Sequence, residues 1–278
     1  MSRHDGGRND GVVEMEIPAE RLPAGFAEDV DHPPAEPAPA KPAATAVLAR
    51  DAAHGPEVLL LRRHRASGFV PGAYVFPGGR VDAADADAAL HEHFVSPAPA
   101  EPPLEYYTAT VREVFEETGV LLAAAAPGAC PPDDSADAAL ARWREELLAD
   151  RATLLDVARA AGRLLDPAAL VYIAHWITPA AEPRRYDTRF FLAPLPAGCT
   201  ARADPREMTD ALWLRPEDAL GRFRSGDLPM VFPTVRTLEQ LAGFADLRSL
   251  TDHFRDRPVD PIQPRLVRTR GGIGIVVD

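Results

Sequence analysis

Residues 112–120 constrain the fold of this chain more than any other stretch. A helix through them, at about 100° per residue, has two unlike faces. Four apolar residues fall within one arc of that helix: Tyr107, Val111, Val114 and Phe115. This arc predicts burial against a hydrophobic core. Gly119 predicts the end of the helix, because glycine commonly occupies the position just past a C-terminus.

The opposite side of the same helix carries three carboxylates, those of Glu113, Glu116 and Glu117. Like charges at this spacing repel one another, so a positive group should lie among them. Arg112 on the flank can supply part of that charge. A hard divalent cation such as Mg²⁺ (or Mn²⁺) can supply more, because it takes oxygen ligands. The alternative interpretation is an ordinary solvated face, which is what charge runs usually form.

A second stretch lies upstream, where a short β-prone run meets a Pro-Gly-Gly turn and then an acid, within residues 72–82. The paired glycines, Gly78 and Gly79, allow positive φ and close approach of the backbone. Such a loop suits a carbonyl or amide that meets a metal or a phosphate. This stretch favours the metal interpretation of the glutamates over the solvated face.

Together the two stretches resemble the signature of the Nudix hydrolase superfamily. That signature is a glycine, five residues, an acid, seven residues, and then Arg-Glu-apolar-x-Glu-Glu-x-Gly-apolar. Gly79 matches the glycine, Asp85 matches the first acid, and residues 112–120 match the remainder at every specified position. The seven-residue gap is here the much longer stretch 86–111, which contains a predicted Ala/Pro/Glu-rich loop at 96–103.

Residues 67–79 and the interrupted motif look like one branch of the family, which includes the peroxisomal acyl-coenzyme A diphosphatase of animals and its bacterial relatives. The resemblance continues through residues 175–179 and 184–191, and it covers roughly residues 44–240. It implies an α+β fold, the Nudix α/β/α sandwich with a mixed sheet, here with a helical insertion.

The resemblance also implies roles for the motif. Glu116 and Glu117 would be metal ligands, and Glu113 would be a ligand or the base that takes the proton from water. The backbone at Gly78 or Gly79 would complete the metal shell and meet the substrate. Such a site suits metal-assisted hydrolysis of a diphosphate, with Mg²⁺ or Mn²⁺ as the cofactor.

Arg112, predicted to be catalytic together with Glu113, would orient the glutamates by charge-assisted hydrogen bonds. Glu207, an acid before a strand that carries a Trp, is a further candidate metal ligand by the same resemblance. Four other arginines are candidates for the diphosphate oxygens, because a planar guanidinium suits phosphate: Arg62, Arg63, Arg185 and Arg189. The alternative for these arginines is a solvated edge or a local ion pair.

Three parts are predicted along the chain. Residues 1–42 are a Pro/Ala-rich leader, disordered or loosely attached. Residues 43–258 are the Nudix domain, with an insertion in the motif at 86–108 and a helical insertion at about 130–166. Residues 259–278 are an extended tail.

Periodicity and turn residues predict the elements of the domain in outline. Strands are predicted at residues 44–50 and 58–62, which form a hairpin, and at 170–178, 189–193 and 273–277. Helices are predicted at residues 136–165, as a pair, and at 216–223 and 234–244.

A formal net charge of −12 argues against general binding to nucleic acid or to an anionic membrane. No apolar run reaches the roughly 18 residues that a membrane span needs, and the N-terminus is polar, unlike a secretory signal. The last residues are not a peroxisomal Ser-Lys-Leu address. We therefore expect a cytoplasmic protein whose partner is a small nucleotide-diphosphate substrate; a homodimer is one option for its assembly.

Three functions are open at this point. The first is a Nudix diphosphatase for coenzyme A or acyl-coenzyme A, which the branch resemblance favours. The second is a Nudix diphosphatase for NADH, FAD or ADP-ribose, which the motif alone does not separate from the first. The third is a non-catalytic Nudix-fold nucleotide sensor, against which the full set of glutamates argues.

Overall fold

The computed structural model describes residues 12–21, 26–64, 71–96, 99–125 and 134–277. Parts of several predictions lie outside these ranges, namely residues 1–11 and 22–25 of the leader, 67–70 of the family resemblance, 97–98 of the motif insertion, 130–133 of the helical insertion and 278 of the tail.

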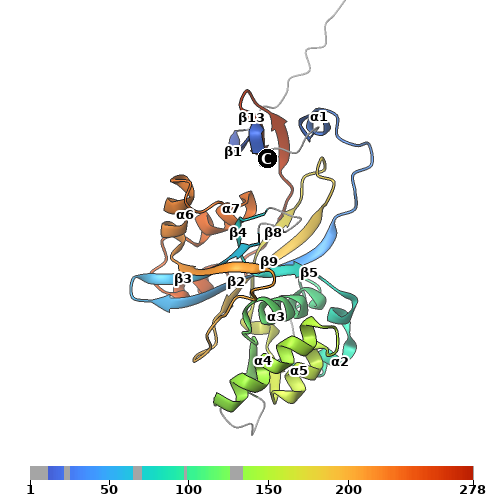
Figure 1. Cartoon of the computed structure of the whole chain (residues 1–278), viewed down its shortest axis with the longest axis vertical. Coiled ribbons are helices and arrows are strands. Elements are labelled where there is room, and N and C mark those ends of the chain that lie inside the picture. Colours follow the sequence, from blue (N-terminus) through green and yellow to red (C-terminus); the bar gives the residue numbers. More distant parts are fainter. Residues whose placement is uncertain (1–11, 22–25, 65–70, 97–98, 126–133, 278) are drawn as a thin grey trace, which may run out of the picture. The chain divides into compact units, whose positions relative to one another are not determined.

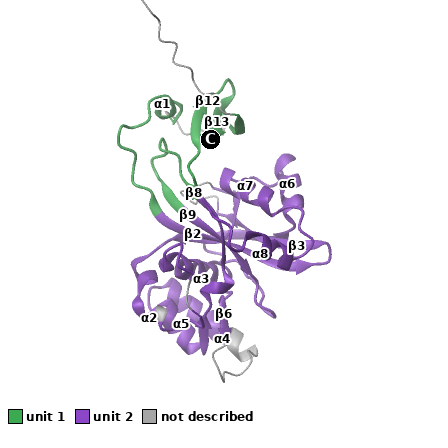
Figure 2. Cartoon of the chain, turned by 180° about the vertical axis from the view of Figure 1, so that it is seen from behind, with its two compact units in different colours: residues 1–41, 176–187, 261–278 green, residues 42–175, 188–260 purple. Residues whose placement is uncertain are grey.

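The chain forms two compact units, which Figure 2 distinguishes by colour. The larger unit comprises residues 42–175 and 188–260, and the smaller one comprises residues 1–41, 176–187 and 261–278. Every residue of the Nudix-like motif belongs to the larger unit.

A sheet with the strand order β10-β3-β2-β9-β8 organises the larger unit. The bounds of these strands are β2 (Lys41–Ala52), β3 (Gly55–Arg63), β8 (Val171–Ile177), β9 (Tyr186–Pro194) and β10 (Met208–Leu214). The predicted hairpin is confirmed: β2 and β3 are antiparallel, with Ala49 opposite Val58. Two short strands, β4 (Tyr74–Val75) and β5 (Gly78–Arg80), pair with β3 and β2 respectively. The pairing of β5 with β2 is what holds the Pro-Gly-Gly turn at the sheet.

Helices cover both sides of this sheet. In Figure 1, α3, α4 and α5 lie on one side, and α6 and α7 lie on the other. The bounds of the helices are α2 (Ala88–His91), α3 (Leu104–Thr118), α4 (Asp134–Leu148), α5 (Leu154–Ala160), α6 (Pro216–Arg224), α7 (Phe232–Leu241) and α8 (Leu247–Phe254). The predicted α+β class, with a mixed sheet between layers of helices, is confirmed.

The helical insertion consists of α4 and α5, joined to the rest by a two-stranded ladder of β6 (Ala123–Ala125) and β7 (Arg163–Leu165). The predicted helix to residue 165 is therefore wrong at its end. Gly162 has φ +60°, a conformation that glycine adopts freely. The chain turns there and enters β7, whose partner β6 lies almost 40 residues back in the sequence.

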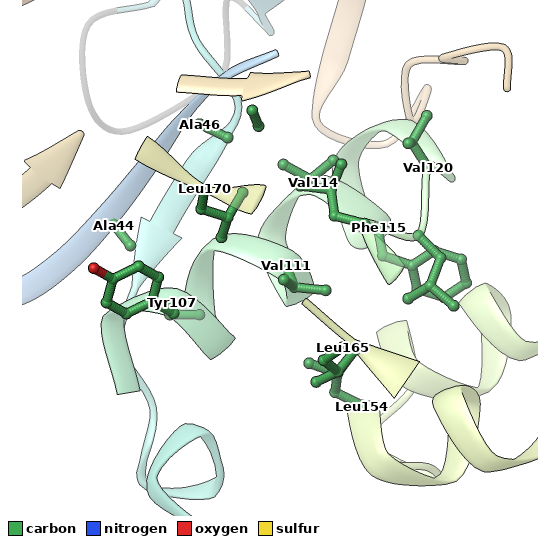
Figure 3. Packing of buried hydrophobic residues seen from close by; sticks show 14 of the residues in the cluster. Ala44, Ala46, Tyr107, Val111, Val114, Phe115, Val120, Leu154, Leu165 and Leu170 are labelled. Carbon is green, nitrogen blue, oxygen red and sulfur yellow. The ribbon is translucent and has the colours of Figure 1, made fainter. Parts of the chain in front are cut away.

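Helix α3 presents its predicted apolar arc to the core. Tyr107, Val111, Val114 and Phe115 are all at most 2% exposed. Figure 3 shows these side chains between the alanines of β2 and leucines of the insertion. The insertion and the motif helix therefore share one hydrophobic core. Gly119 ends the helix at φ +74°, as predicted.

The smaller unit contains a sheet with the order β1-β13-β12. The three strands of this sheet are β1 (Val13–Pro18), β12 (Arg265–Arg268) and β13 (Gly272–Val276). The smaller unit also contains α1 (Phe26–Asp31) and the short strand β11 (Pro261–Ile262). Ile17 of β1 lies opposite Ile273 of β13. Part of the predicted leader thus has regular structure, because β1 finds its partner strand at the far end of the sequence, which composition does not reveal.

Within the described ranges, the structure holds no helix that combines the length and the apolar character of a membrane span.

Candidate functional site

Arg112 supplies the positive group that was predicted for the acidic face of α3. Its Nε and Nη2 donate to both oxygens of Asp85, each at 2.9 Å. Its Nη2 also donates to the carbonyl of Arg80 at 2.7 Å, which ties the helix to the end of β5. Asp85 is 1% exposed, and its carboxylate also accepts from the amide of Asp82 at 2.8 Å. A buried bidentate pair of this kind gives Arg112 one orientation.

The remaining Nη1 of Arg112 reaches two of the three glutamates. It donates to Glu113 at 2.8 Å and to Glu116 at 3.0 Å. Gly79 faces the first of these: a Cβ built on Gly79 would lie 2.6 Å from the carboxyl carbon of Glu113. The glycine is therefore needed for space, so that the Glu113 carboxylate can lie against the backbone of the turn.

Glu117 has a different environment, because its carboxylate accepts from the backbone amide of Gly78 at 3.1 Å. The side chain is buried, with 5% of the residue exposed. Arg63 on β3 is the nearby cation that favours the charged form of Glu117, and Glu207 is a nearby acid that opposes it. The structure thus brings Glu117, Gly78, Arg63 and Glu207 into one neighbourhood, although Glu207 itself is exposed.

Burial raises the pKa of all three glutamates. It raises the pKa of Glu113 to about 7, with the charge of Arg112 acting in the opposite direction. Burial, and then repulsion from Glu113, raises the pKa of Glu117 well above its usual range. The pKa of Glu116 is also raised, again mainly by burial. The interpretation as an ordinary solvated face is therefore wrong, because these carboxylates are largely withdrawn from water.

The donor chemistry of the three glutamates fits a divalent cation. Mg²⁺ takes carboxylate and carbonyl oxygens, and repulsion between buried Glu113 and Glu117 is what a cation would relieve. Across the part of the chain that the structure describes, however, no three acidic, His or Cys side chains form a ready group for a metal ion. Arg112 instead holds Glu113 and Glu116 as ion-pair partners.

The predicted phosphate-binding arginines have other recorded partners within their own units. Arg62 lies over the ring of Tyr74, at 5.7 Å from its centroid. Arg185 belongs to the smaller unit, where it donates to the carbonyls of Thr178 at 3.1 Å and Ala38 at 2.8 Å. Arg189 lies 4.3 Å from the ring centroid of Tyr106 and donates to its hydroxyl at 2.9 Å. Arg63 acts electrostatically on Glu117 of the motif, and a phosphate role for any of the four arginines stays a prediction.

Sequence reasoning missed the residues that surround the C-terminal end of α3. Arg144 of α4 donates from Nε to the carbonyl of Glu116 at 2.8 Å. Asp204, which is 4% exposed, donates its amide to the carbonyl of Glu117 at 2.9 Å. No local pattern marks these residues. Arg144 meets α3 because the insertion packs against the core, and Asp204 does so from the segment between β9 and β10.

Comparisons with known proteins identify the family of this chain. The family model described as the NUDT19 Nudix domain matches residues 96–241. The chain is 30% identical over 252 residues to the acyl-coenzyme A diphosphatase NUDT19 of Gallus gallus, an alignment of 73% of this chain and 66% of the relative. With the human protein of the same name, identity is 30% over 264 residues, covering 80% of this chain and 70% of the relative. The chain thus spans about two thirds of the length of these relatives.

A solved structure supports the fold. The crystal structure of a Nudix hydrolase from Alicyclobacillus acidocaldarius is 31% identical and superposes with a TM-score of 0.64, over 79% of this chain and 99% of that one. The chain belongs to the Nudix hydrolases, in the family of the NUDT19 Nudix domain. The resemblance drawn from residues 79, 85 and 112–120 is thereby confirmed.

Proposed function

We propose that this protein is a diphosphatase that uses Mg²⁺ or Mn²⁺ to hydrolyse coenzyme A or its acyl thioesters. The observation that carries the proposal is the set of largely buried glutamates beside the Pro-Gly-Gly turn, where Glu117 accepts from the amide of Gly78 and Glu113 lies against Gly79. The substrate class is suggested by the relatives from chicken and human, both named acyl-coenzyme A diphosphatases.

In the proposed reaction, water attacks one phosphorus of the diphosphate, and the bond from that phosphorus to the bridging oxygen breaks. The products from coenzyme A are 3′,5′-ADP and 4′-phosphopantetheine, which keeps the acyl group when a thioester is the substrate. A divalent cation held by Glu116 and Glu117, with Glu113 or Glu207 as further ligands, would neutralise phosphate oxygens and acidify the attacking water.

The chain's own residues would hold and move the proton. Glu113 lies against Gly79 and is oriented by Arg112, so it would be placed to take the proton from water if it is not itself a metal ligand. Arg112 keeps Glu113 and Glu116 oriented through its Nη1, while its bond to Arg80 keeps the helix beside the turn.

The non-catalytic nucleotide sensor is the second candidate. The contacts of Arg112 with Glu113 and Glu116 would be compatible with either function, so turnover of a substrate decides between them.

The test is product release from a panel of coenzyme A, an acyl-coenzyme A, NADH, FAD and ADP-ribose, each with Mg²⁺, with Mn²⁺ and with EDTA. We expect the highest kcat/KM for coenzyme A or its thioester, and no turnover with EDTA. A preference for NADH, FAD or ADP-ribose would instead support the second Nudix function. Nucleotide binding with no turnover under either metal would support the sensor. The cytoplasmic location and the homodimer stay predictions.

A further inference from the structure

The C-terminal end of α3 is held from outside the helix. The last carbonyls of a helix lack intrahelical partners, yet each of the four here accepts a hydrogen bond. The carbonyl of Phe115 accepts from the amide of Gly119 at 2.9 Å, and that of Glu116 accepts from Nε of Arg144 at 2.8 Å. The carbonyl of Glu117 accepts from the amide of Asp204 at 2.9 Å, and that of Thr118 accepts from the amide of Arg202 at 2.8 Å. Two of these carbonyls belong to the predicted metal ligands Glu116 and Glu117.

Arg144 is the one side chain among these four donors, and it comes from the helical insertion. Its Nη1 lies against the helix terminus, where a Cβ on Gly119 would be 3.4 Å away. Among the described residues, its buried Nη2 has no hydrogen-bond partner. Burial lowers the pKa of Arg144, and Asp204, Glu145 and Glu117 act against that shift. Arg144 thus brings a positive charge to the end of α3, beside the carbonyl of Glu116.

A second arginine extends the same contact to the predicted ligand Glu207. Nη2 of Arg206 donates to Glu145 of α4 at 3.1 Å, and its Nε donates to Asp204 at 3.1 Å. The amide of Glu207 then donates to the carbonyl of Asp204 at 3.2 Å, and the carbonyl of Glu207 accepts from His64 at 3.0 Å. Helix α4 therefore contacts both the helix that carries Glu116 and Glu117 and the loop that carries Glu207.

We infer that Arg144 is a positioning residue through which the helical insertion holds Glu116 and Glu117 in place for cation binding. The inference rests on the proposed function, since it takes these glutamates as metal ligands. The insertion is then part of the machinery of the site rather than an appendage of the fold. Partners that orient metal ligands from outside commonly change metal affinity when they are altered.

The test measures Mn²⁺ binding to the full chain without substrate, by titration calorimetry or by the loss of the free-Mn²⁺ EPR signal. Arg144→Met keeps the length of the side chain but removes its charge and donors. We expect Mn²⁺ to bind roughly 10-fold to 100-fold more weakly than to the wild type. In turnover assays, kcat should fall at low metal while KM for coenzyme A changes little. Arg144→Lys should recover part of the affinity, because one charged donor remains.

Two variants of the same helix are controls. Arg142→Gln removes an exposed arginine of α4 and should bind Mn²⁺ as the wild type does. Leu147→Ala weakens the buried side of α4 without touching the carbonyl of Glu116. If Leu147→Ala loses as much Mn²⁺ affinity as Arg144→Met for an equal loss of Tm, general loosening is the cause and the inference is overturned.

Wild-type Mn²⁺ affinity in Arg144→Met would overturn the inference as well. Failure of the proposed function gives a different result. A wild type that binds Mn²⁺ but cleaves no substrate counts against the diphosphatase, whereas the comparison of Mn²⁺ affinities still tests Arg144.

Discussion

The two faces of α3 are both withdrawn from water, but for opposite physical reasons. On one face, Val114 and Phe115 are fully buried among hydrocarbon side chains, and burying such a side chain contributes about 1.5–3 kcal/mol. On the other face, burial acts against the charged forms of Glu113, Glu116 and Glu117. That face is kept together by Arg112 and the amide of Gly78. Burial by itself therefore does not distinguish the core from the site. The two differ in what surrounds the buried groups: hydrocarbon side chains on one face, and a cation and a backbone amide on the other.

The largest effect is expected on the apolar face. Val114→Asp puts a charge where no partner exists, and we expect it to destabilise the protein by more than about 4 kcal/mol, enough to prevent folding. Solubility and a thermal melt measure this. Val12→Asp is the matched control, because Val12 is 79% exposed and should change stability by no more than about 0.5 kcal/mol. A soluble Val114→Asp protein with a normal melt would mean that the two faces are reversed.

The next effect is expected at the ion-pair centre of the acidic face. Arg112→Met leaves Asp85 buried without its cation, and breaking one side of a buried pair costs about 3–5 kcal/mol. Urea denaturation of the variant measures this cost. Arg236→Met is the control, because its pair with Glu239 lies at the surface, with both side chains 38% exposed, where such pairs contribute about 0–1 kcal/mol. Equal losses of unfolding free energy in the two variants would show that the Arg112 pair contributes no more than a surface pair.

A smaller effect is expected at the turn that meets the acidic face. Gly79→Ala places a methyl group 2.6 Å from the Glu113 carboxyl carbon, and overpacking of this kind costs about 1–3 kcal/mol. Turnover should fall further than stability, because Glu113 must move. Gly221→Ala in α6 is the control, since its Cβ would meet nothing within 4 Å and alanine is the better helix former by about 0.5–1 kcal/mol. Unchanged turnover in Gly79→Ala would show that Glu113 need not lie against the turn.

The smallest effect on stability is expected for Glu117→Gln, although its effect on turnover should be large. Burial already disfavours the charged carboxylate, whose pKa is raised well above its usual range, so a neutral amide should leave Tm unchanged or slightly higher. Turnover should fall by orders of magnitude, because a predicted metal ligand is lost. Glu105→Gln, in the first turn of the same helix, should keep its activity. A wild-type kcat in Glu117→Gln would contradict the role assigned to that carboxylate.

Most features of α3 could be predicted from local sequence patterns. The positions of Val114 and Glu117 on opposite faces, and the end of the helix at Gly119, follow from residue spacing and from the conformational freedom of glycine. The place of Arg112 between Asp85 and Glu113 could not be read in the same way, because a loop of variable length separates Asp85 from the helix. Its position depends on how that loop folds.

The contacts that reach the C-terminal end of α3 from other parts of the chain could not be predicted from the sequence. Arg144 meets the carbonyl of Glu116 across 28 residues, and Asp204 meets Glu117 across almost 90. Neither contact is marked by any periodic pattern in the sequence.

Arg62 and Arg63 are neighbours in one strand, but successive side chains of a strand point to opposite faces. That alternation separates them: Arg62 lies over Tyr74, while Arg63 faces Glu117.

The pairing of β1 with β13 has a practical consequence for anyone who shortens this chain. Trimming residues 13–18 would leave the whole length of β13 on that side with unsatisfied amides and carbonyls, and bare strand borders invite other molecules to add on. Conversely, trimming residues 272–276 would remove the central strand, so that both β1 and β12 would lose their partner. Truncations intended to improve crystals or solubility should therefore keep all three strands of this sheet or remove all three.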